Sequence, residues 1–434
     1  MTATPTDIDT VDVDVDADGT SSRPVAGSTN PSAGATHAGP GDAYVASRMD
    51  SESSWVVVVA AFIAMFTVFG VAYSFGEFFG PMADEFGTDR AQTALFFAIT
   101  TFAYFALGII SGRIADRIGP RRVVLFGAVV MVIGLMLTAE VSSIELGYLT
   151  YGLGVGIGVA CCYVPMVAAV GGWFTDRRTL ALGLAVAGIG TGTLVLVPVM
   201  EWLIERNGWR DAYRTLALVT AVLLALAAIG AHRPPSNGAA PLPVRQVISG
   251  RSEFWVLYVA SLFVTVALFT PFVFLADYMD TTGTSGSAAV LLGLLGMTSI
   301  IGRLSFGAIA ARIGIMGLYR VSFAVLGASF LIWLAAGTNY TLLVVFVLVL
   351  GIAYGGFIAL SPAVVAELFG TVGMGGVLGA LYTAAGFGGL VGPPLMGWII
   401  DNSGYTAAQL TALGSGLIGA TLLLFLRAPA NLDS

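Results

Sequence analysis

Residues 112–122 read Gly-Arg-Ile-Ala-Asp-Arg-Ile-Gly-Pro-Arg-Arg and form a short charged loop between two long apolar segments. Gly112 ends the first segment, and a residue without a side chain lets a second helix approach closely there. Asp116 can pair with nearby arginines or cap a facing helix, and Gly119 permits a tight turn. The stretch therefore predicts two neighbouring helices joined by a basic turn.

Apolar segments recur along the whole chain from Trp55 onward. Twelve of them have about 20 residues or more, which is enough for a helix to cross a hydrocarbon core of about 30 Å. Lipid offers no partner for backbone N–H and C=O groups, so we expect an all-α membrane protein. The predicted spans are 55–80, 91–112, 122–141, 144–171, 179–203, 210–231, 254–277, 288–312, 318–337, 340–367, 374–400 and 405–427.

The composition excludes other classes of protein. The chain is 57% apolar and only 10% charged, whereas a soluble protein carries about 25% charged residues, so an ordinary water-soluble enzyme is excluded. All 19 basic residues are arginines, and the net charge of −7 arises in residues 1–53, where nine acidic residues stand against two arginines. We expect this stretch to be a disordered acidic cytoplasmic tail. No stretch is basic enough to bind nucleic acid.

The arginines outside the tail indicate the orientation of the chain. Twelve of them lie near one set of predicted loops and four near the other set. Positive residues gather on the cytoplasmic side of membrane proteins. We therefore expect a multi-pass protein of the cell (plasma) membrane with both termini in the cytoplasm.

The sequence also repeats. A polar linker at 232–253 separates six spans at 54–231 from six spans at 254–434. A shift of 196 residues brings several pairs into register, namely Gly190 with Gly386, Pro198 with Pro394, Trp202 with Trp398 and Glu205 with Asp401. Two homologous six-helix halves in the same orientation are typical of a secondary transporter whose substrate binds between them.

The loop at 112–122 matches the pattern G-x-x-x-D-R-x-G-x-R-R and resembles the signature of the major facilitator superfamily. The resemblance implies a charge clasp that stabilises the outward-open state. Its candidate residues are Gly112, Asp116, Arg117, Gly119, Arg121 and Arg122. A degenerate copy at 307–314 has Ala311 in place of the acid, so any clasp there is weaker.

Residues 172–188 narrow the resemblance. They contain Trp173-Phe174, Arg177-Arg178 and Ala187-Gly188 at the spacing of the fifth-helix signature of monocarboxylate transporters. The glycine-rich tenth and eleventh spans resemble the oxalate:formate antiporter family equally well. Both resemblances imply a carboxylate substrate.

Arg303 is the decisive single residue. It lies about 15 residues from one end of its span and about 9 from the other, which at about 1.5 Å per residue is near the midplane. A charge there is costly and usually faces a cavity, and the guanidinium fork suits a carboxylate. Both similar families place an arginine at this position and use it to bind the substrate. The alternative is a structural ion pair, but the span of Arg303 contains no acid.

The sequence departs from these families around Arg303. Ser299 stands where animal monocarboxylate transporters have an aspartate, Tyr73 where they have a lysine, and Ala385 where the oxalate antiporter has a lysine. A single buried positive charge favours a monoanion over a dianion. The candidate substrate-binding residues are Arg303, Tyr73, Tyr163, Tyr354, Tyr382 and Ser299, although each tyrosine alone could be a packing aromatic.

The remaining titratable residues limit the chemistry. Asp277, Glu77 and Glu367 are candidate proton carriers, but each lies near a helix end, where a solvated carboxylate is the alternative. Both histidines lie outside the predicted spans, and the two cysteines are adjacent within an apolar run. We therefore expect no metal site and no cofactor.

Together these patterns predict a transporter that moves a small monocarboxylate such as lactate, pyruvate or formate by alternating access. Transport would be coupled to a proton or occur by anion exchange, with the monomer as the functional unit. The alternatives are an exporter of drugs or of another organic anion such as oxalate, and a membrane sensor. An enzyme would need clustered His, Asp, Glu or Cys at the midplane, which the predicted spans lack.

Overall fold

Helices make up all the regular structure of the described residues. The computed structural model describes residues 52–174, 177–234, 248, 250–370 and 374–426. The predicted tail up to residue 51 and most of the predicted linker lie outside them. The longer elements are α2 (Glu52–Tyr73), α3 (Phe75–Phe86), α4 (Arg90–Ile118), α5 (Pro120–Thr138), α7 (Gly154–Trp173), α8 (Arg178–Gly230), α10 (Ser252–Thr282), α11 (Ala288–Ile313), α12 (Ile315–Ala336), α13 (Tyr340–Phe369) and α14 (Met374–Leu422). The all-α prediction is confirmed for this part of the chain.

Short elements complete the fold. The helix α6 (Ile144–Gly147) leads into a π-helical turn, η1 (Tyr148–Leu153), and a 3-10 turn, η2 (Leu423–Phe425), follows α14. The described residues contain ten helical stretches long and apolar enough to cross a membrane. Two of these stretches, in α8 and α14, are much longer than the others, at 51 and 50 residues.

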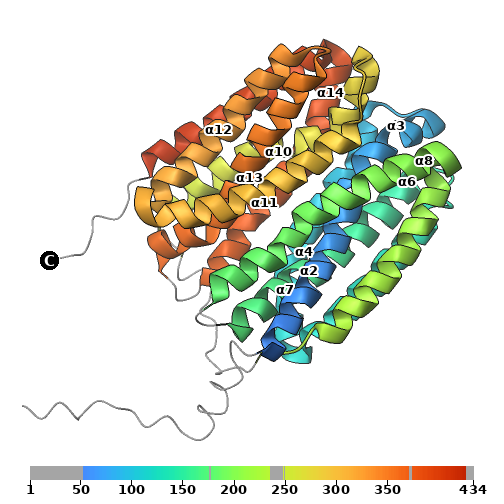
Figure 1. Ribbon diagram of the computed structural model, residues 1–434. Helices are drawn as coiled ribbons and strands as arrows, with labels where there is room; N and C mark the ends of the chain where they lie inside the picture. The colour runs from blue at the N-terminus through green and yellow to red at the C-terminus, as the bar shows by residue number, and fades with distance from the viewer. Residues whose placement is uncertain (1–51, 175–176, 235–247, 249, 371–373, 427–434) are drawn as a thin grey trace, which may run out of the picture. The chain divides into compact units, whose positions relative to one another are not determined.

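A glycine with non-helical backbone angles interrupts each of the two long helices. Gly208 in α8 has φ 81° and ψ 162°, and Gly404 in α14 has φ 81° and ψ 172°. The chain of α8 reverses its direction and returns beside itself (Figure 1). Positive φ is readily adopted only by glycine. Since Gly208 and Gly404 are 196 residues apart, the backbone turns occur in the register of the sequence repeat.

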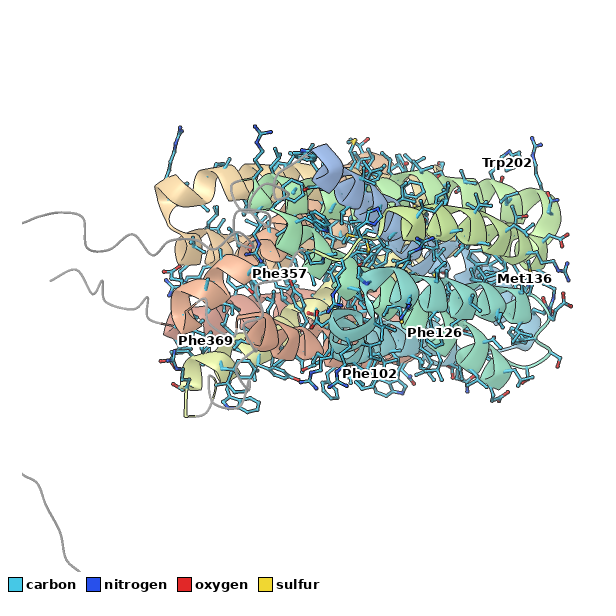
Figure 2. All side chains as sticks on the ribbon, turned by 90° about the horizontal axis from the view of Figure 1, so that it is seen from below. Phe102, Phe126, Met136, Trp202, Phe357 and Phe369 are labelled. Carbon is cyan, nitrogen blue, oxygen red and sulfur yellow. The ribbon has the colours of Figure 1, made fainter. Side chains whose placement is uncertain are left out.

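Large apolar side chains cover the outside of the helices (Figure 2). Phe126 is 59% exposed, Trp398 is 58% exposed and Trp255 is 61% exposed. Such an extensive exposed apolar surface is rare on a soluble monomer and is typical of helices in contact with lipid.

The helices before α10, blue to green in Figure 1, lie beside those from α10 on, yellow to red. We call them the N-terminal group (α2–α8) and the C-terminal group (α10–α14). The groups touch through α8 with α11 and through α4 with α14. At the first contact, a Cβ on Gly190 would lie 2.3 Å from the backbone oxygen of Gly296, so only glycine permits this approach.

Candidate functional site

Arg303 is buried at the contact between the two groups. Its exposure is 6%, and it is the only charged residue classed as buried within the described ranges. Its Nη1 donates to the backbone oxygen of Val186 in α8 at 2.8 Å. Within the described part of the chain, its Nε and Nη2 are buried without a hydrogen-bond partner, and none of the recorded ion pairs includes it. A buried guanidinium with two unpaired nitrogens is costly unless an anion completes it.

A close crossing of α11 and α13 positions this guanidinium. A Cβ on Gly355 would lie 2.1 Å from the backbone oxygen of Ser299, and a Cβ on Gly302 would lie 2.2 Å from that of Ile352. The two helices therefore meet backbone to backbone beside Arg303. The crossing sets the guanidinium carbon 5.6 Å from the ring centroid of Tyr354, within cation–π range.

An aromatic cavity lies between the two groups; Arg303 is not among its lining residues but contacts one of them, the ring of Tyr354. All four predicted tyrosines line it: Tyr73, Tyr163, Tyr354 and Tyr382. The hydroxyls of Tyr73 and Tyr354 lie 3.3 Å apart and join α2 to α13. The cavity volume is about 30 Å³, roughly the space of one water molecule, so the cavity is closed tightly in this state.

Sequence reasoning missed one lining tyrosine. Tyr104 in α4 also faces the cavity and packs against Phe69 and Phe105 with ring centroids 5.8 Å and 4.4 Å away. It lies 14 residues after Arg90, or about 21 Å along the helix, which is mid-depth in the bundle. A tyrosine at that depth is the signal that could have identified it.

Ser299 is not among the residues that line the cavity. It is fully buried, and its hydroxyl donates to the backbone oxygen of Gly296 in its own helix at 2.7 Å. Its backbone rather than its side chain takes part in the crossing with α13.

The predicted clasp residues lie where α4 ends and α5 begins, which we call the loop end of the molecule. Gly119 has φ 90°, which suits glycine at this turn, and a Cβ on Gly112 would lie 3.1 Å from Val164 in α7. The carboxylate-bearing Asp116 is exposed, and its backbone oxygen accepts a hydrogen bond from Arg233. Arg117, Arg121 and Arg122 are exposed as well.

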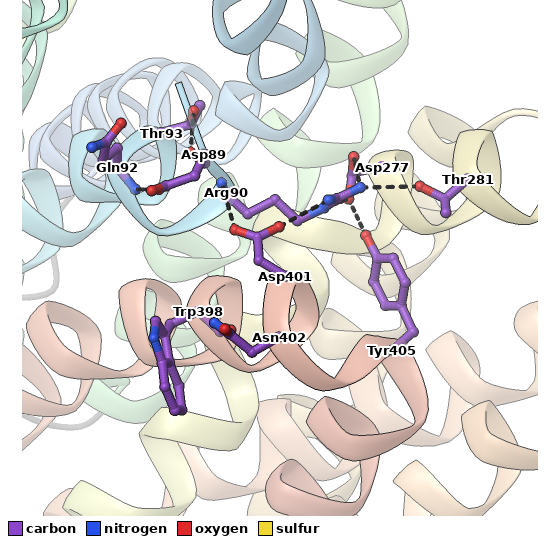
Figure 3. Close-up of polar contacts among 10 residues, drawn as sticks. All are labelled: Asp89, Arg90, Gln92, Thr93, Asp277, Thr281, Trp398, Asp401, Asn402 and Tyr405. Carbon is purple, nitrogen blue, oxygen red and sulfur yellow. Dashed lines mark hydrogen bonds and ion pairs between the residues drawn. The ribbon is translucent and has the colours of Figure 1, made fainter. Parts of the chain in front are cut away.

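The opposite end of α4 carries an ion-pair network that the sequence did not reveal (Figure 3). Arg90 Nε donates to Asp277 Oδ2 at 2.6 Å, and Arg90 Nη1 donates to Asp401 Oδ1 at 2.9 Å. Thr281 and Tyr405 complete the network, the latter by donating its hydroxyl to Asp277. We call these five residues the Arg90 network and this end of the molecule the network end. The network ties α4 to α10 and α14 across the two groups.

A second contact crosses the groups at the same end. Ser287 caps the start of α11 and donates to both carboxylate oxygens of Glu201 in α8, at 2.9 Å and 2.8 Å. Because α10 ends at Thr282 and α11 begins at Ala288, this contact lies at the end that contains the Arg90 network.

The three candidate proton carriers occupy different environments. Asp277 is held by Arg90 and Tyr405. Glu367 is exposed near the end of α13. Glu77 in α3 has one carboxylate oxygen, Oε1, that is buried without a hydrogen-bond partner in the described ranges. Within these ranges no group of three or more His, Cys, Asp or Glu residues could hold a metal ion.

Comparison with known proteins identifies the family. The model of the Major Facilitator Superfamily matches residues 57–355 and, again, residues 318–433. Monocarboxylate transporter 12 of Xenopus laevis is 29% identical over 86% of this chain and 88% of its own. Agnestins efflux protein AgnL12 of Paecilomyces divaricatus is 28% identical over 86% of this chain and 87% of its own. A crystal structure of a mutant of the nucleoside transporter NupG has the same fold, with a TM-score of 0.68, 15% identity and coverage of 86% of this chain and 99% of that one. These relatives are transporters, not enzymes.

Proposed function

Because the chain belongs to the Major Facilitator Superfamily, we propose that it carries a small monocarboxylate across the cell membrane by alternating access. The observation that carries this proposal is the buried guanidinium of Arg303, whose Nε and Nη2 have no partner in the described part of the chain. Two adjacent N–H donors fit the two oxygens of a carboxylate. The relative named as a monocarboxylate transporter supports the same substrate class.

The proposed transporter has twelve membrane crossings in two six-helix halves. The glycines Gly208 and Gly404 would each divide a long helix into two crossings, which turns the ten candidate stretches into twelve. The proposed halves are 54–231 and 254–434, joined by the linker 232–253 and preceded by a cytoplasmic tail at 1–53. The arginine distribution supports a cytoplasmic loop end and cytoplasmic termini, and the proposed functional unit is the monomer.

The described state is closed at the network end in this proposal. Hydrogen bonds that cross the two groups in the described ranges lie at the network end or at the central cavity. If the network end is the outer side, these contacts close the outside. The clasp of Gly112, Asp116, Arg117, Gly119, Arg121 and Arg122 would close the loop end in the outward-open state.

Uptake into proteoliposomes tests the substrate. The purified protein should exchange radiolabelled lactate, pyruvate or formate for the same unlabelled acid, because each presents one carboxylate to one guanidinium. Oxalate should exchange poorly, since its second carboxylate has no buried cation. Exchange of oxalate alone, or export of a neutral drug without any monocarboxylate transport, would favour the exporter alternative, for which the efflux relative is the supporting observation.

We propose Glu77 as the proton carrier that couples substrate transport to a proton gradient. Asp277 is engaged in the Arg90 network, whereas Glu77 has a buried oxygen that a proton would satisfy. We expect Glu77→Gln to abolish substrate accumulation driven by an inward proton gradient and to leave exchange of substrate for substrate intact. Glu367→Gln, at an exposed carboxylate, is the matched control and should leave both activities unchanged. Gradient-driven accumulation by the Glu77 variant would remove Glu77 from the mechanism and leave exchange as the mode.

A further inference from the structure

The walls of the central cavity differ from what a three-carbon acid requires. Nine of its fourteen lining residues are aromatic, four phenylalanines and five tyrosines. We propose that the substrate is an aromatic monocarboxylate, with its carboxylate on Arg303 and its ring between the two helix groups. This inference rests on the proposed function, because it uses the same carboxylate site.

Ring pairs from opposite groups pack beside the cavity, and each pair includes one lining residue, Tyr73 or Phe269. Tyr73 of α2 stacks on Phe272 of α10 with centroids 4.4 Å apart and an interplanar angle of 30°. Phe97 of α4 meets Phe269 of α10 edge to face at 5.4 Å. When the groups separate, these faces lose their aromatic partners. A substrate ring replaces those contacts, whereas lactate or formate has no π face to offer.

The same pattern occurs on the other side of the cavity. Phe105 of α4 lies 6.0 Å from Tyr382 of α14, again across the two groups. Within the N-terminal group, Phe69 presents its ring edge to face against Tyr163 at 5.2 Å and 88°. A flat ring inserted between the groups therefore meets aromatic edges and faces on both sides, and aromatic pairs contribute about 0.5–1.5 kcal/mol each beyond burial.

The polar groups of the cavity limit what the ring can carry. No charged residue is among the lining residues in the described ranges, and the nearby cation is Arg303, which lies against the lining ring of Tyr354. An ammonium or a second carboxylate would therefore be buried without a partner. The hydrogen-bonding groups of the lining are the tyrosine hydroxyls and Thr265, whose hydroxyl already donates to the backbone oxygen of Ser261. Once the two groups separate, these lining residues therefore suit benzoate-like or phenylacetate-like monoanions and disfavour amino acids and dicarboxylates.

The selectivity of the wild-type protein tests this inference. We would measure the affinity of the purified full-length protein for benzoate, phenylacetate, lactate and cyclohexanecarboxylate by calorimetry. Cyclohexanecarboxylate matches benzoate in size and apolar area but lacks the π system. We expect the aromatic acids to bind about tenfold more tightly than lactate and several-fold more tightly than cyclohexanecarboxylate, as one or two aromatic pairs would give.

Variants separate the ring contact from the carboxylate contact. Phe269→Leu and Phe105→Leu should reduce the preference for benzoate over lactate, while Arg303→Ala should weaken both acids. Phe330→Leu, at a buried ring of α12 that does not line the cavity, is the matched control and should keep the preference.

Two results would overturn the inference. If lactate binds as tightly as benzoate and Arg303→Ala weakens both, the substrate need not be aromatic. The proposed monocarboxylate function would then stand without this inference. Equal affinity for cyclohexanecarboxylate and benzoate would reject the role of the π face. A protein that binds none of the four acids would overturn the proposed function itself.

Discussion

Arg303 and the glycines around it act together at the scale of single residues. The guanidinium has one internal acceptor, the backbone oxygen of Val186, and a tyrosine ring within cation–π range. Neither compensates for a buried charge as a carboxylate does. The guanidinium is therefore held in place by the packing of α11 against α13, where glycines allow backbone contact.

This packing predicts the effect of a single methyl group. Gly355→Ala places a Cβ 2.1 Å from the backbone oxygen of Ser299, which cannot move without shifting α11. We expect a loss of about 1–3 kcal/mol in the free energy of unfolding, as overpacking usually costs, measured as a lower melting temperature in detergent. Gly414→Ala in α14, where nothing lies within 4 Å of the added Cβ, is the control. Its melting temperature should stay within error or rise. Equal losses in the two variants would show that α11 and α13 are not closely packed at Gly355.

At the scale of elements, breaking the Arg90 network should change which end of the molecule is open. Arg90→Gln removes the charge that ties α4 to Asp277 and Asp401, so the network end should open more often. The measurement is labelling of a cysteine at Ala385, a cavity-lining position, by an impermeant thiol reagent from outside intact cells. The background lacks both native cysteines.

The matched control for Arg90 is Arg214. It pairs with Glu140 and Asp211 inside the N-terminal group, so Arg214→Gln should leave the labelling rate unchanged. Faster labelling only with Arg90→Gln supports a lock between the groups. Identical rates for the two variants would reduce the network to local stabilisation of the helix ends.

The clasp at the loop end predicts an effect on the rate of transport. Asp116→Asn should lower the maximal transport rate more than it lowers substrate affinity, because this loop is far from the cavity and acts on the balance between states. Initial uptake rates over a range of substrate concentrations separate the two quantities. An unchanged maximal rate would leave Asp116 without a role in the transport cycle.

The limits of sequence-based prediction follow from the range of the interactions involved. Helical spans and the buried arginine were predictable, because lipid forces every backbone group into a helix and makes an internal charge costly. The Arg90 network was not predictable, because Asp277 and Asp401 lie 187 and 311 residues after Arg90 in the sequence. In addition, an arginine beside a loop looks the same in the sequence whether it forms an ion pair or only sets the orientation of the chain in the membrane. The sequence predicts Ser299 at the substrate site, but a helical serine readily bonds to the carbonyl three residues before it, as Ser299 does to Gly296.

At the scale of the whole molecule, the sequence repeat and the paired glycine turns support one topology. Gly119 and Gly314 directly precede α5 and α12 and have φ values of 90° and 95°. Gly208 and Gly404 interrupt α8 and α14, and each has a φ of 81°. Matching turns 195 or 196 residues apart are expected if a six-helix unit was duplicated.

The topology predicts which loops meet the cytoplasm. A single cysteine at Arg121, in a background without Cys161 and Cys162, should resist an impermeant thiol reagent in intact cells and react after the cells are opened. A single cysteine at the exposed Glu145, near the network end, should react from outside. The reverse pattern would invert the orientation of the protein.

The central claim is that Arg303 binds the carboxylate of the substrate, and ligand affinity of its variants tests it most directly. Arg303→Lys keeps the charge and loses the fork, while Arg303→Ala loses both. Since a charged hydrogen bond contributes about 1.5–3 kcal/mol, the alanine variant should bind a monocarboxylate on the order of tenfold to a hundredfold more weakly, and the lysine variant should lie between. Arg320→Ala, at an arginine that donates to Leu423 and Leu426 away from the cavity, controls for the loss of an arginine. Arg303→Ala with a normal melting temperature and the wild-type affinity would contradict the assignment.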